Sequence, residues 1–381
     1  EDPEFARRFR VKVDFAESFT SSDETRRASA IFVANACRDL GLPHFSAAAV
    51  ARILEDGHRN VSDQSRQSAI FASVEALVME SAALCRARAG RVGATSTVGT
   101  PIVGPQDVEA AIAARTKRHD YPDQRLQEAI AEGDLLIDVH GGKTGQINGL
   151  TQVYLGDYRF GFPVRVTART YAGEDGLLNI EREVEMSGPI HDKGVLILQN
   201  YLSALFAHIA PLALNASVVF EQEYSGVEGD SASCAELYAL LSSLSDIPLK
   251  QGIAVTGAVN QHGEVLPVGG LNEKIEGYFR VCEKAGLDGS QGVLIPYRNR
   301  RHLMLERNVV EAVEKGLFHI YTAEHVSAGI ELLTGCPMGV ADNAGDFPPG
   351  SVLGNAQKTL MAYRRACQAS EHQKSGRKHL H

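Results

Sequence analysis

The stretch Thr256-Gly-Ala-Val-Asn-Gln-His-Gly-Glu-Val-Leu-Pro-Val-Gly-Gly-Leu-Asn-Glu-Lys274 predicts a strand, a turn, a second strand and a helix in immediate succession. His262-Gly263 supplies the turn between the two strands. The apolar stripe of the helix recurs at about 100° per residue and is formed by Leu271, Ile275, Tyr278, Phe279 and Cys282. Lys274 falls at the edge of this stripe, whereas Glu273 and Glu276 are predicted to project towards water. The helix therefore turns an ammonium group towards the interior of the protein.

A lysine kept away from water must be paired or must lose its proton. A fall in its pKa from about 10.4 to near 7 corresponds to roughly 4 kcal/mol. The plain alternative is that the aliphatic stem is buried while the amine stays in water. Burial becomes useful beside a hydroxyl, because a neutral amine can take the proton of a serine and later give it to a leaving amine.

A serine with this potential lies in the stretch Gly226-Val-Glu-Gly-Asp-Ser-Ala-Ser-Cys-Ala-Glu236, directly before a predicted helix. The start of that helix would offer backbone N–H groups to an oxyanion formed at Ser231. The alternative is a structural role, since Asp230, Ser231 or Ser233 could each cap the helix. Ser233 and Glu236 also have the spacing of a capping box.

Taken together, the two stretches favour a catalytic dyad of Ser231 and Lys274 over other chemistries. The neighbouring His191-Asp192 pair does not suit a serine-histidine-aspartate triad, because adjacent residues point in different directions on a helix or strand. Gly141-Gly-Lys-Thr144 resembles the end of a phosphate-binding loop, but position 137 is Ile where that loop requires glycine.

The composition is that of a soluble globular protein with two domains. The chain has 381 residues, of which 44% are hydrophobic and 22% charged. The net charge of -9 makes nucleic-acid binding an unfavoured function. The six cysteines form no CxxC pair, so no metal site is predicted. Because no segment has the length and apolarity of a membrane span and no signal-peptide pattern is seen, we expect a cytoplasmic protein without a membrane partner.

The hydrophobic periodicity divides the chain into four parts: residues 1–22, an all-helical domain at 23–120, an α+β domain at 121–340, and a C-terminal helix and tail at 341–381. Helices are predicted in the first domain at 26–40, 46–59, 67–90 and 108–119, with a loop at 90–104. In the second domain, strands are predicted at 135–139, 151–156, 163–171, 176–185, 217–224, 252–259, 292–296 and 318–323. Helices are predicted there at 193–207, 232–245, 271–285 and 307–315. A last helix is predicted at 356–370, followed by a disordered end.

The motifs around Ser231 and Lys274, taken together, resemble those of a known family. The segments Gly229-Asp-Ser-Ala232, Thr256-Gly257, Gly269-Gly-Leu-Asn-Glu-Lys274 and Gly292-Val-Leu-Ile-Pro296 are similar to motifs of the proteolytic domain of Lon proteases, in particular the LonB-like group. The resemblance extends from about Asp134 to Gly335. It implies an α+β fold of the Lon proteolytic type, with mixed sheets and packed helices.

The resemblance also implies roles for single residues. Ser231 is implied to be the nucleophile, Lys274 the general base, and Thr256 a hydroxyl that orients the lysine. Glu228 stands where the family usually carries an acidic residue near the nucleophile, with a secondary supporting role. Ser233 stands where many Lon proteins have glycine, so the packing of the helix at this position is expected to differ.

The helical region is similar to the lid domain that follows the ATPase core in these proteins, and residues 1–22 resemble the end of that core. The implied function is that of a serine endopeptidase that cleaves unfolded or damaged proteins as a homo-oligomer, a six-membered ring. ATP and Mg²⁺ serve the full-length family, but nucleotide motifs are absent here, so no cofactor is expected in this chain. The chain is then expected to be either part of a larger protease or a form that cleaves unfolded chains without the ATPase core. The alternative function is a non-catalytic, ring-forming module like that of some DNA-repair ATPases.

Overall fold

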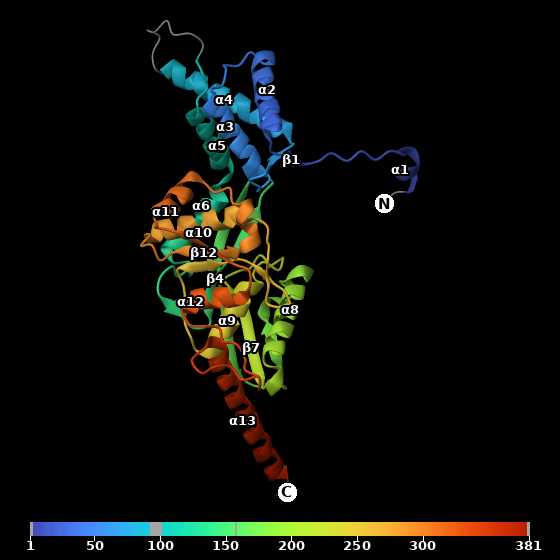
Figure 1. Cartoon of the computed structure of the whole chain (residues 1–381), viewed down its shortest axis with the longest axis vertical. Coiled ribbons are helices and arrows are strands. Elements are labelled where there is room, and N and C mark those ends of the chain that lie inside the picture. Colours follow the sequence, from blue (N-terminus) through green and yellow to red (C-terminus); the bar gives the residue numbers. More distant parts are fainter. Residues whose placement is uncertain (1–2, 92–100, 157, 379–381) are drawn as a thin grey trace. The chain divides into compact units, whose positions relative to one another are not determined.

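The computed structural model describes residues 3–91, 101–156 and 158–378 of the chain (Figure 1). The chain divides into two compact units, Glu1–Asp120 with Arg301–Met304 and Tyr121–Arg300 with Leu305–His381. Among the helices of the described ranges, none has the length and apolar character needed to cross a bilayer.

The first unit is built of helices with one short pair of strands. Its elements are α1 (Pro3–Arg8), β1 (Ser18–Thr20), α2 (Asp23–Asp39), α3 (Ala47–Asn60), β2 (Arg66–Ser68), α4 (Phe71–Arg91) and α5 (Pro105–His119). The predicted helices of this region are present, while the antiparallel pair β1–β2 was not predicted. The predicted loop at 90–104 falls mostly outside the described residues.

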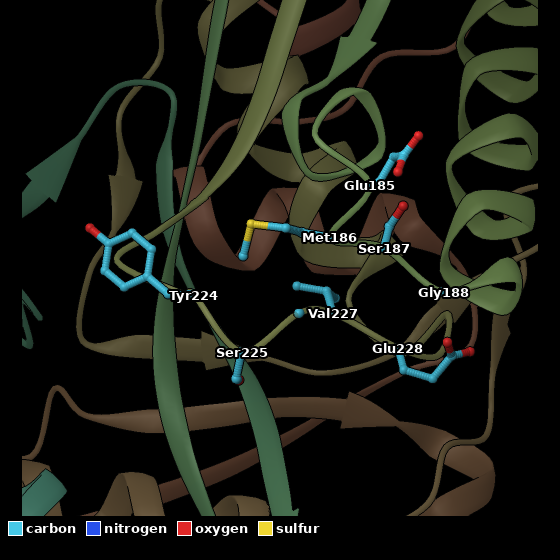
Figure 2. Close-up of a pocket in the computed structure, with 9 residues that line it drawn as sticks. Glu185, Met186, Ser187, Gly188, Tyr224, Ser225, Val227 and Glu228 are labelled. Carbon is cyan, nitrogen blue, oxygen red and sulfur yellow. The ribbon is translucent and has the colours of Figure 1, made fainter.

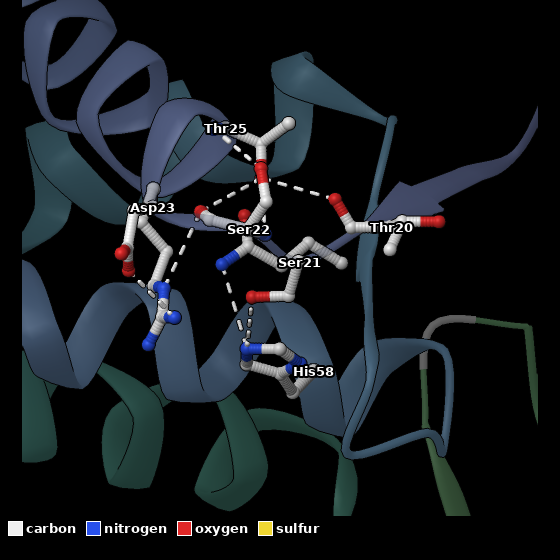
Figure 3. A network of polar contacts seen from close by, with 8 residues as sticks. Thr20, Ser21, Ser22, Asp23, Thr25 and His58 are labelled. Carbon is white, nitrogen blue, oxygen red and sulfur yellow. Dashed lines mark hydrogen bonds and ion pairs between the residues drawn. The ribbon is translucent and has the colours of Figure 1, made fainter.

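Polar side chains fix the start of α2. Ser22 Oγ accepts a hydrogen bond from the backbone N–H of Thr25 over 3.2 Å, and Thr25 Oγ1 accepts one from the N–H of Ser22 over 2.8 Å. Ser21 Oγ lies 3.4 Å from Nε2 of His58 on α3 (Figure 3). This capping box satisfies two N–H groups that the helix cannot satisfy itself.

The second unit contains the remaining elements. Its strands are β3 (Gly142–Lys143), β4 (Gln146–Tyr154), β5 (Arg159–Ala172), β6 (Gly176–Asn179), β7 (Leu214–Glu221), β8 (Leu249–Lys250), β9 (Ile253–Val255), β10 (Ala258–Val259), β11 (Val265–Leu266), β12 (Gly292–Pro296) and β13 (His319–Ala323). Its α-helices are α6 (Tyr121–Glu132), α7 (Ile180–Glu183), α8 (Pro189–Leu205), α9 (Ser233–Ser245), α10 (Leu271–Ala285), α11 (Arg307–Glu314), α12 (Val326–Thr334) and α13 (Val352–Lys378). The described residues also form the 3₁₀ helices η1 (Ala207–Ile209) and η2 (Tyr297–His302), and the last two residues of η2 count to the first unit.

A seven-stranded mixed sheet in the order β13-β12-β9-β4-β5-β7-β6 organises this unit. Strands β13, β12, β9 and β4 pair in parallel, whereas β5 is antiparallel to both β4 and β7. The hairpin predicted at His262-Gly263 is present as β10 and β11. The predicted α+β class is therefore confirmed.

The helices α9 and α10 cover opposite faces of the sheet. Val164, Val166 and Ala168 of β5 belong to the hydrophobic core around α9. Gly161 of the same strand lies instead against the backbone of α10. Because successive strand residues face opposite sides of a sheet, the two helices lie on different sides.

Two strand predictions in this unit were wrong. Residues 135–139 form no strand, because side chains satisfy their backbone: Asn148 Nδ2 donates to the carbonyl of Asp138 over 2.7 Å, and Gln222 Oε1 accepts from the N–H of Leu136 over 2.9 Å. The strand predicted at 176–185 ends at Asn179, whose side chain accepts from Arg182 N and caps the short helix α7.

The end of the chain also differs from the prediction. The last helix, α13, runs from Val352 to Lys378, so the end expected to be disordered is helical up to Lys378. Its first residues are buried against α9, and its polar end contains Glu, Gln, Lys and Arg, which favour continuation of a helix.

The helix α6 was not predicted. Pro122 is the second residue of α6, and proline is compatible with the first turn of a helix. Asp123 of α6 pairs with Arg280 of α10 over 2.9 Å, and Gln127 Nε2 donates to the carbonyl of Gly277 over 3.3 Å. These contacts tie α6 to α10.

Two glycines allow α10 to approach the sheet closely. A Cβ atom added to Gly277 would collide with the carbonyl group of Gly161, and one added to Gly161 would collide with the backbone of Glu273 and Lys274. No side chain can separate the helix from β5 at this point. The contact therefore fixes the depth of the first turns of α10, where Lys274 lies.

We expect the substitution Gly277→Ala to lower the free energy of unfolding of the second unit by about 2 kcal/mol, because the added methyl group forces α10 away from β5. Gly57→Ala is the matched control: Gly57 also lies inside a helix, but no atom lies within 4 Å of an added Cβ. It should be neutral or stabilise by up to about 1 kcal/mol. Urea denaturation measures both changes, and equal effects of the two substitutions would contradict the contact.

Candidate active site

Lys274 lies in the first turn of α10 with its side chain buried, at 3% relative exposure. Its Nζ donates a hydrogen bond to Ser231 Oγ over 2.9 Å and one to Thr256 Oγ1 over 3.2 Å. The structure thus brings together three of the four predicted site residues, although 43 positions separate Ser231 from Lys274 in the chain.

The backbone around Ser231 is held by the strand end that carries Thr256. Thr256 directly follows β9, and its N–H donates to the carbonyl of Leu294 on β12 over 3.1 Å. The carbonyl of Ser231 accepts from Gly257 N over 2.8 Å and from Thr256 Oγ1 over 3.4 Å. Thr256 Oγ1 therefore accepts from the lysine and donates to the serine backbone, which orients both.

Burial controls the charge of Lys274. Loss of water around the amine lowers its pKa from 10.5 to about 8, while the carboxylates of Asp230 and Glu273 oppose this change. A larger fraction of this amine is neutral near pH 7 to 8 than for a lysine in water. The shift corresponds to about 3 kcal/mol of lost preference for the charged form.

The capping interpretation of the serine stretch is wrong. The helix α9 begins at Ser233 with Ala232 at the N-cap, and no side chain caps it. Ser233 Oγ instead accepts from Val259 N over 3.0 Å, and Glu236 is buried in contact with Asn179. The hydroxyl of Ser231 is left to interact with the lysine.

One further expectation on α10 is wrong. Glu276 was predicted to project into water, but it is 3% exposed and accepts from the N–H of Glu306 over 2.9 Å. Nearly the whole circumference of α10 is buried, because β4 and β5 cover one side, α6 packs against another, and Glu306, the N-cap of α11, hydrogen-bonds Glu276.

Glu228 is placed apart from the Ser231–Lys274 contact. Its exposed carboxylate lies against Gly188, the N-cap of α8 (Figure 2), and within the described residues no hydrogen bond joins it to Ser231 or Lys274. Its supporting role stays a prediction. The carboxylates whose charges act on Lys274 are instead those of Asp230 and Glu273, of which Asp230 belongs to the same motif as Glu228 and was considered above only as a helix cap.

An open pocket of about 390 Å³ adjoins the loop that leads to Ser231 (Figure 2). Two backbone hydrogen bonds join its walls: Gly188 N donates to Val227 O, and Val227 N donates to Met186 O, each over 2.9 Å. The lining residues are Glu185, Met186, Ser187, Gly188, Tyr224, Ser225, Gly226, Val227 and Glu228. Tyr224 stands exposed at its rim.

His191 and Asp192 form no triad with the serine. The His191 ring is buried and hydrogen-bonds the backbone of Gly229, and its Nε2 lies 3.8 Å from Glu236 Oε1. Asp192 accepts a hydrogen bond from Ser187 Oγ over 2.5 Å. No sequence pattern indicated the His191–Gly229 contact, because a single histidine in a helix is most often a core residue.

Metal ligation has no candidate in the described ranges, where no three His, Cys, Asp or Glu side chains converge in a way that could hold an ion.

Family models match both units of the chain. Residues 44–118 match the model described as the AAA+ ATPase lid domain of archaeal LonB. Residues 225–333 match the C-terminal proteolytic domain of Lon protease (S16), and this range includes Ser231, Thr256 and Lys274.

Curated relatives agree with these matches. A Lon protease homologue of Escherichia coli strain K12 is 42% identical over 60% of this chain and 39% of its own length. An archaeal Lon protease of Methanothermobacter thermautotrophicus is 28% identical over 81% of this chain and 45% of its own length. The chain thus spans about two fifths of the length of these relatives. By these matches, the chain carries a region similar to the lid domain of archaeal LonB, followed by a region similar to the proteolytic domain of Lon protease.

Proposed function

We propose that this chain is a serine peptidase in which Ser231 is the nucleophile and Lys274 the general base. The observation that carries the proposal is the 2.9 Å contact between Ser231 Oγ and a buried amine whose pKa is lowered to about 8. A non-catalytic module would gain nothing from keeping this amine away from water, because the burial lowers the stability of the fold.

In the acylation step, neutral Lys274 Nζ accepts the proton of Ser231 as the Oγ atom attacks the carbonyl carbon of the peptide bond. The resulting ammonium donates this proton to the leaving amine, and the C–N bond breaks. Water then attacks the acyl-serine and passes its proton to Lys274, which returns it to Ser231 Oγ. Thr256 keeps the amine directed at the serine in both steps.

The negative charge on the tetrahedral intermediate needs donors that are already in place. The N–H of Ala232 follows the nucleophile directly and lies at the N-terminal end of α9. We propose that the backbone here stabilises the oxyanion, since the N-terminal end of a helix carries partial positive charge.

We propose that an extended segment of an unfolded protein is the substrate, with one of its side chains in the open pocket beside Val227. We further propose a homo-oligomeric, six-membered assembly located in the cytoplasm, as the family resemblance implies. Peptide hydrolysis at this site is proposed to need no metal or nucleotide. ATP and Mg²⁺ would act on substrate delivery in a longer protein.

We expect Ser231→Ala and Lys274→Ala each to reduce cleavage of an unfolded, casein-like substrate to background without loss of circular-dichroism signal. Each removes one partner of the proton transfer. Ser290→Ala, an exposed serine before β12, is the matched control and should keep full activity; a chelator should have no effect. Full activity in either dyad variant would contradict the proposal.

Cleavage should become faster as the pH rises from 6 to 8. Only the neutral amine can act as a base, so the rate should change about tenfold per pH unit well below the lysine pKa. Initial rates with a short fluorogenic peptide measure this limb, and a rate that is constant between pH 5 and 8 would exclude Lys274 as the base.

Lys274→Met should stabilise the second unit by about 2 kcal/mol at pH 7. The pKa of Lys274 is lower in the folded state than in the unfolded state, so the unfolded state binds more protons between about pH 8 and 10.5. Wild-type stability should therefore rise across this window, and the advantage of the variant should shrink there. Lys193→Met, on the exposed side of α8, is the control. A Lys274→Met variant that is less stable than wild type at pH 7 would show that the amine is not desolvated.

A further inference from the structure

A group of buried titratable side chains lies behind the loop that carries Ser231. Glu181 of α7, His191 of α8 and Glu236 of α9 are 4%, 1% and 2% exposed. None of them takes part in the proton transfers between Ser231 and Lys274. Burial of three such groups is unfavourable unless each is paired, which makes their pairing informative.

The pairing is incomplete. Asn179 Nδ2 donates to Glu236 Oε1 over 3.1 Å and lies 3.5 Å from His191 Nε2. Glu181 Oε1 accepts from Phe220 N over 2.7 Å. In the part of the chain that the structure describes, Oε2 of Glu181 and Oε2 of Glu236 are buried without a hydrogen-bond partner. A negative charge on either carboxylate would be buried without a hydrogen bond to its second oxygen, which is unfavourable. A protonated carboxyl group avoids this cost because it carries no charge.

This group is joined directly to the nucleophile loop. Since His191 Nε2 faces Asn179 and Glu236, the ring uses its other nitrogen, Nδ1, to donate to the backbone of Gly229, two residues before Ser231. The backbone of Gly229 has a φ of 86°, a conformation that residues other than glycine rarely adopt. A fixed donor at this point limits the freedom of the loop.

The helix α8 makes a second contact with the same loop, at Asp230. A Cβ atom added to Gly194 would lie 3.2 Å from Cβ of Asp230, so α8 packs closely against the residue before Ser231. Movement of His191 would therefore be transmitted to both Gly229 and Asp230.

The charged groups that act on these three side chains are carboxylates of neighbouring residues. Asp192 and Glu228 act on His191, Glu181 acts on Glu236, and Glu221 and Glu223 act on Glu181. Burial raises the pKa of Glu236 to about 8 and raises the pKa of Glu181, while it lowers the pKa of His191 below its usual value. At neutral pH, Glu236 is mostly protonated and His191 is neutral.

We propose that His191 and Glu236 are positioning residues for Ser231, and that loss of the Glu236 proton releases the Gly229–Ser231 loop from its place beside Lys274. The expected change in cleavage rate rests on the proposed peptidase function, whereas the release of the loop does not. Ionised Glu236 would face the lone pair of His191 Nε2 and the carboxyl group of Glu181, so the group would have to open or take up water. Ionisation of Glu236 would therefore lower the rate of cleavage at high pH, whereas protonation of Lys274 lowers it at low pH.

The pH–rate profile tests this limit. Wild-type kcat/KM should fall by about tenfold per pH unit well above pH 8. Glu236→Gln keeps an acceptor for Asn179 but cannot ionise, so its rate should reach a plateau. At pH 9.5 the variant should be at least about tenfold faster than wild type. Identical alkaline limbs in the two proteins would overturn the proposal.

Substitution of the histidine separates positioning from general structure. His191→Leu removes the donor to Gly229 and should lower kcat by about tenfold or more with little change in KM, because the substrate pocket is retained. His191→Asn places an amide near Nδ1 and should restore a large part of kcat. Equal losses in both variants, or a loss confined to KM, would contradict the assigned role.

A readout that needs no turnover completes the test. In the inactive Ser231→Ala protein, hydrogen exchange of residues 226–236, corrected for the intrinsic rate, should lose protection by about tenfold between pH 7.5 and 9.5. Residues 292–296 serve as an internal control and should not change. Addition of Glu236→Gln should abolish the loss. If the protection of residues 226–236 in the folded Ser231→Ala protein stays constant over this pH range, the inference is overturned. This outcome does not depend on whether the double variant with Glu236→Gln folds. Failure of Ser231→Ala to reduce cleavage would instead refute the peptidase proposal and leave this measurement decisive for the loop.

Discussion

The exclusion of water from the amine of Lys274 is the constraint on which the proposed chemistry of this chain depends. An amine in water near neutral pH is almost fully protonated and cannot accept a proton from serine. At 3% exposure its pKa falls to about 8, and its Nζ lies 2.9 Å from Ser231 Oγ. The same burial makes the fold less stable, which is a common feature of sites that need a reactive group in a defined place.

The architecture meets this constraint from two sides. Gly161 and Gly277 let α10 contact the sheet backbone, so Lys274 is held at a fixed depth. Ser231 comes from the loop before α9 on the other face of the sheet, and Thr256, at the end of β9, hydrogen-bonds both. The site forms just beyond the end of a central strand, where α/β proteins commonly bind their ligands. The Glu181–His191–Glu236 group lies on the side of α9 and supports the loop from behind.

The sequence predicted the elements that follow local rules. The helix at 271–285 and the strand at 292–296 were predicted with the bounds that the structure shows, because apolar periodicity and flanking glycines mark them. The helix α6 was missed and residues 135–139 were taken as a strand, since tertiary contacts decide these segments. At the site, the motifs predicted that Ser231 and Lys274 lie close together. The burial of Glu276 and the hydrogen bond of His191 to the backbone of Gly229 could not be predicted, because they depend on packing that no local pattern encodes.

The central claim concerns the ionisation of one amine, and this can be measured directly. In protein labelled with ¹³C at the lysine Cε, the chemical shift of Lys274, assigned by comparison with Lys274→Met, reports its titration. The account predicts a midpoint of about 8, well below that of the exposed lysines. A midpoint near 10.5 would show that the amine is solvated and protonated at neutral pH, and a Ser-Lys mechanism at this site would then be untenable.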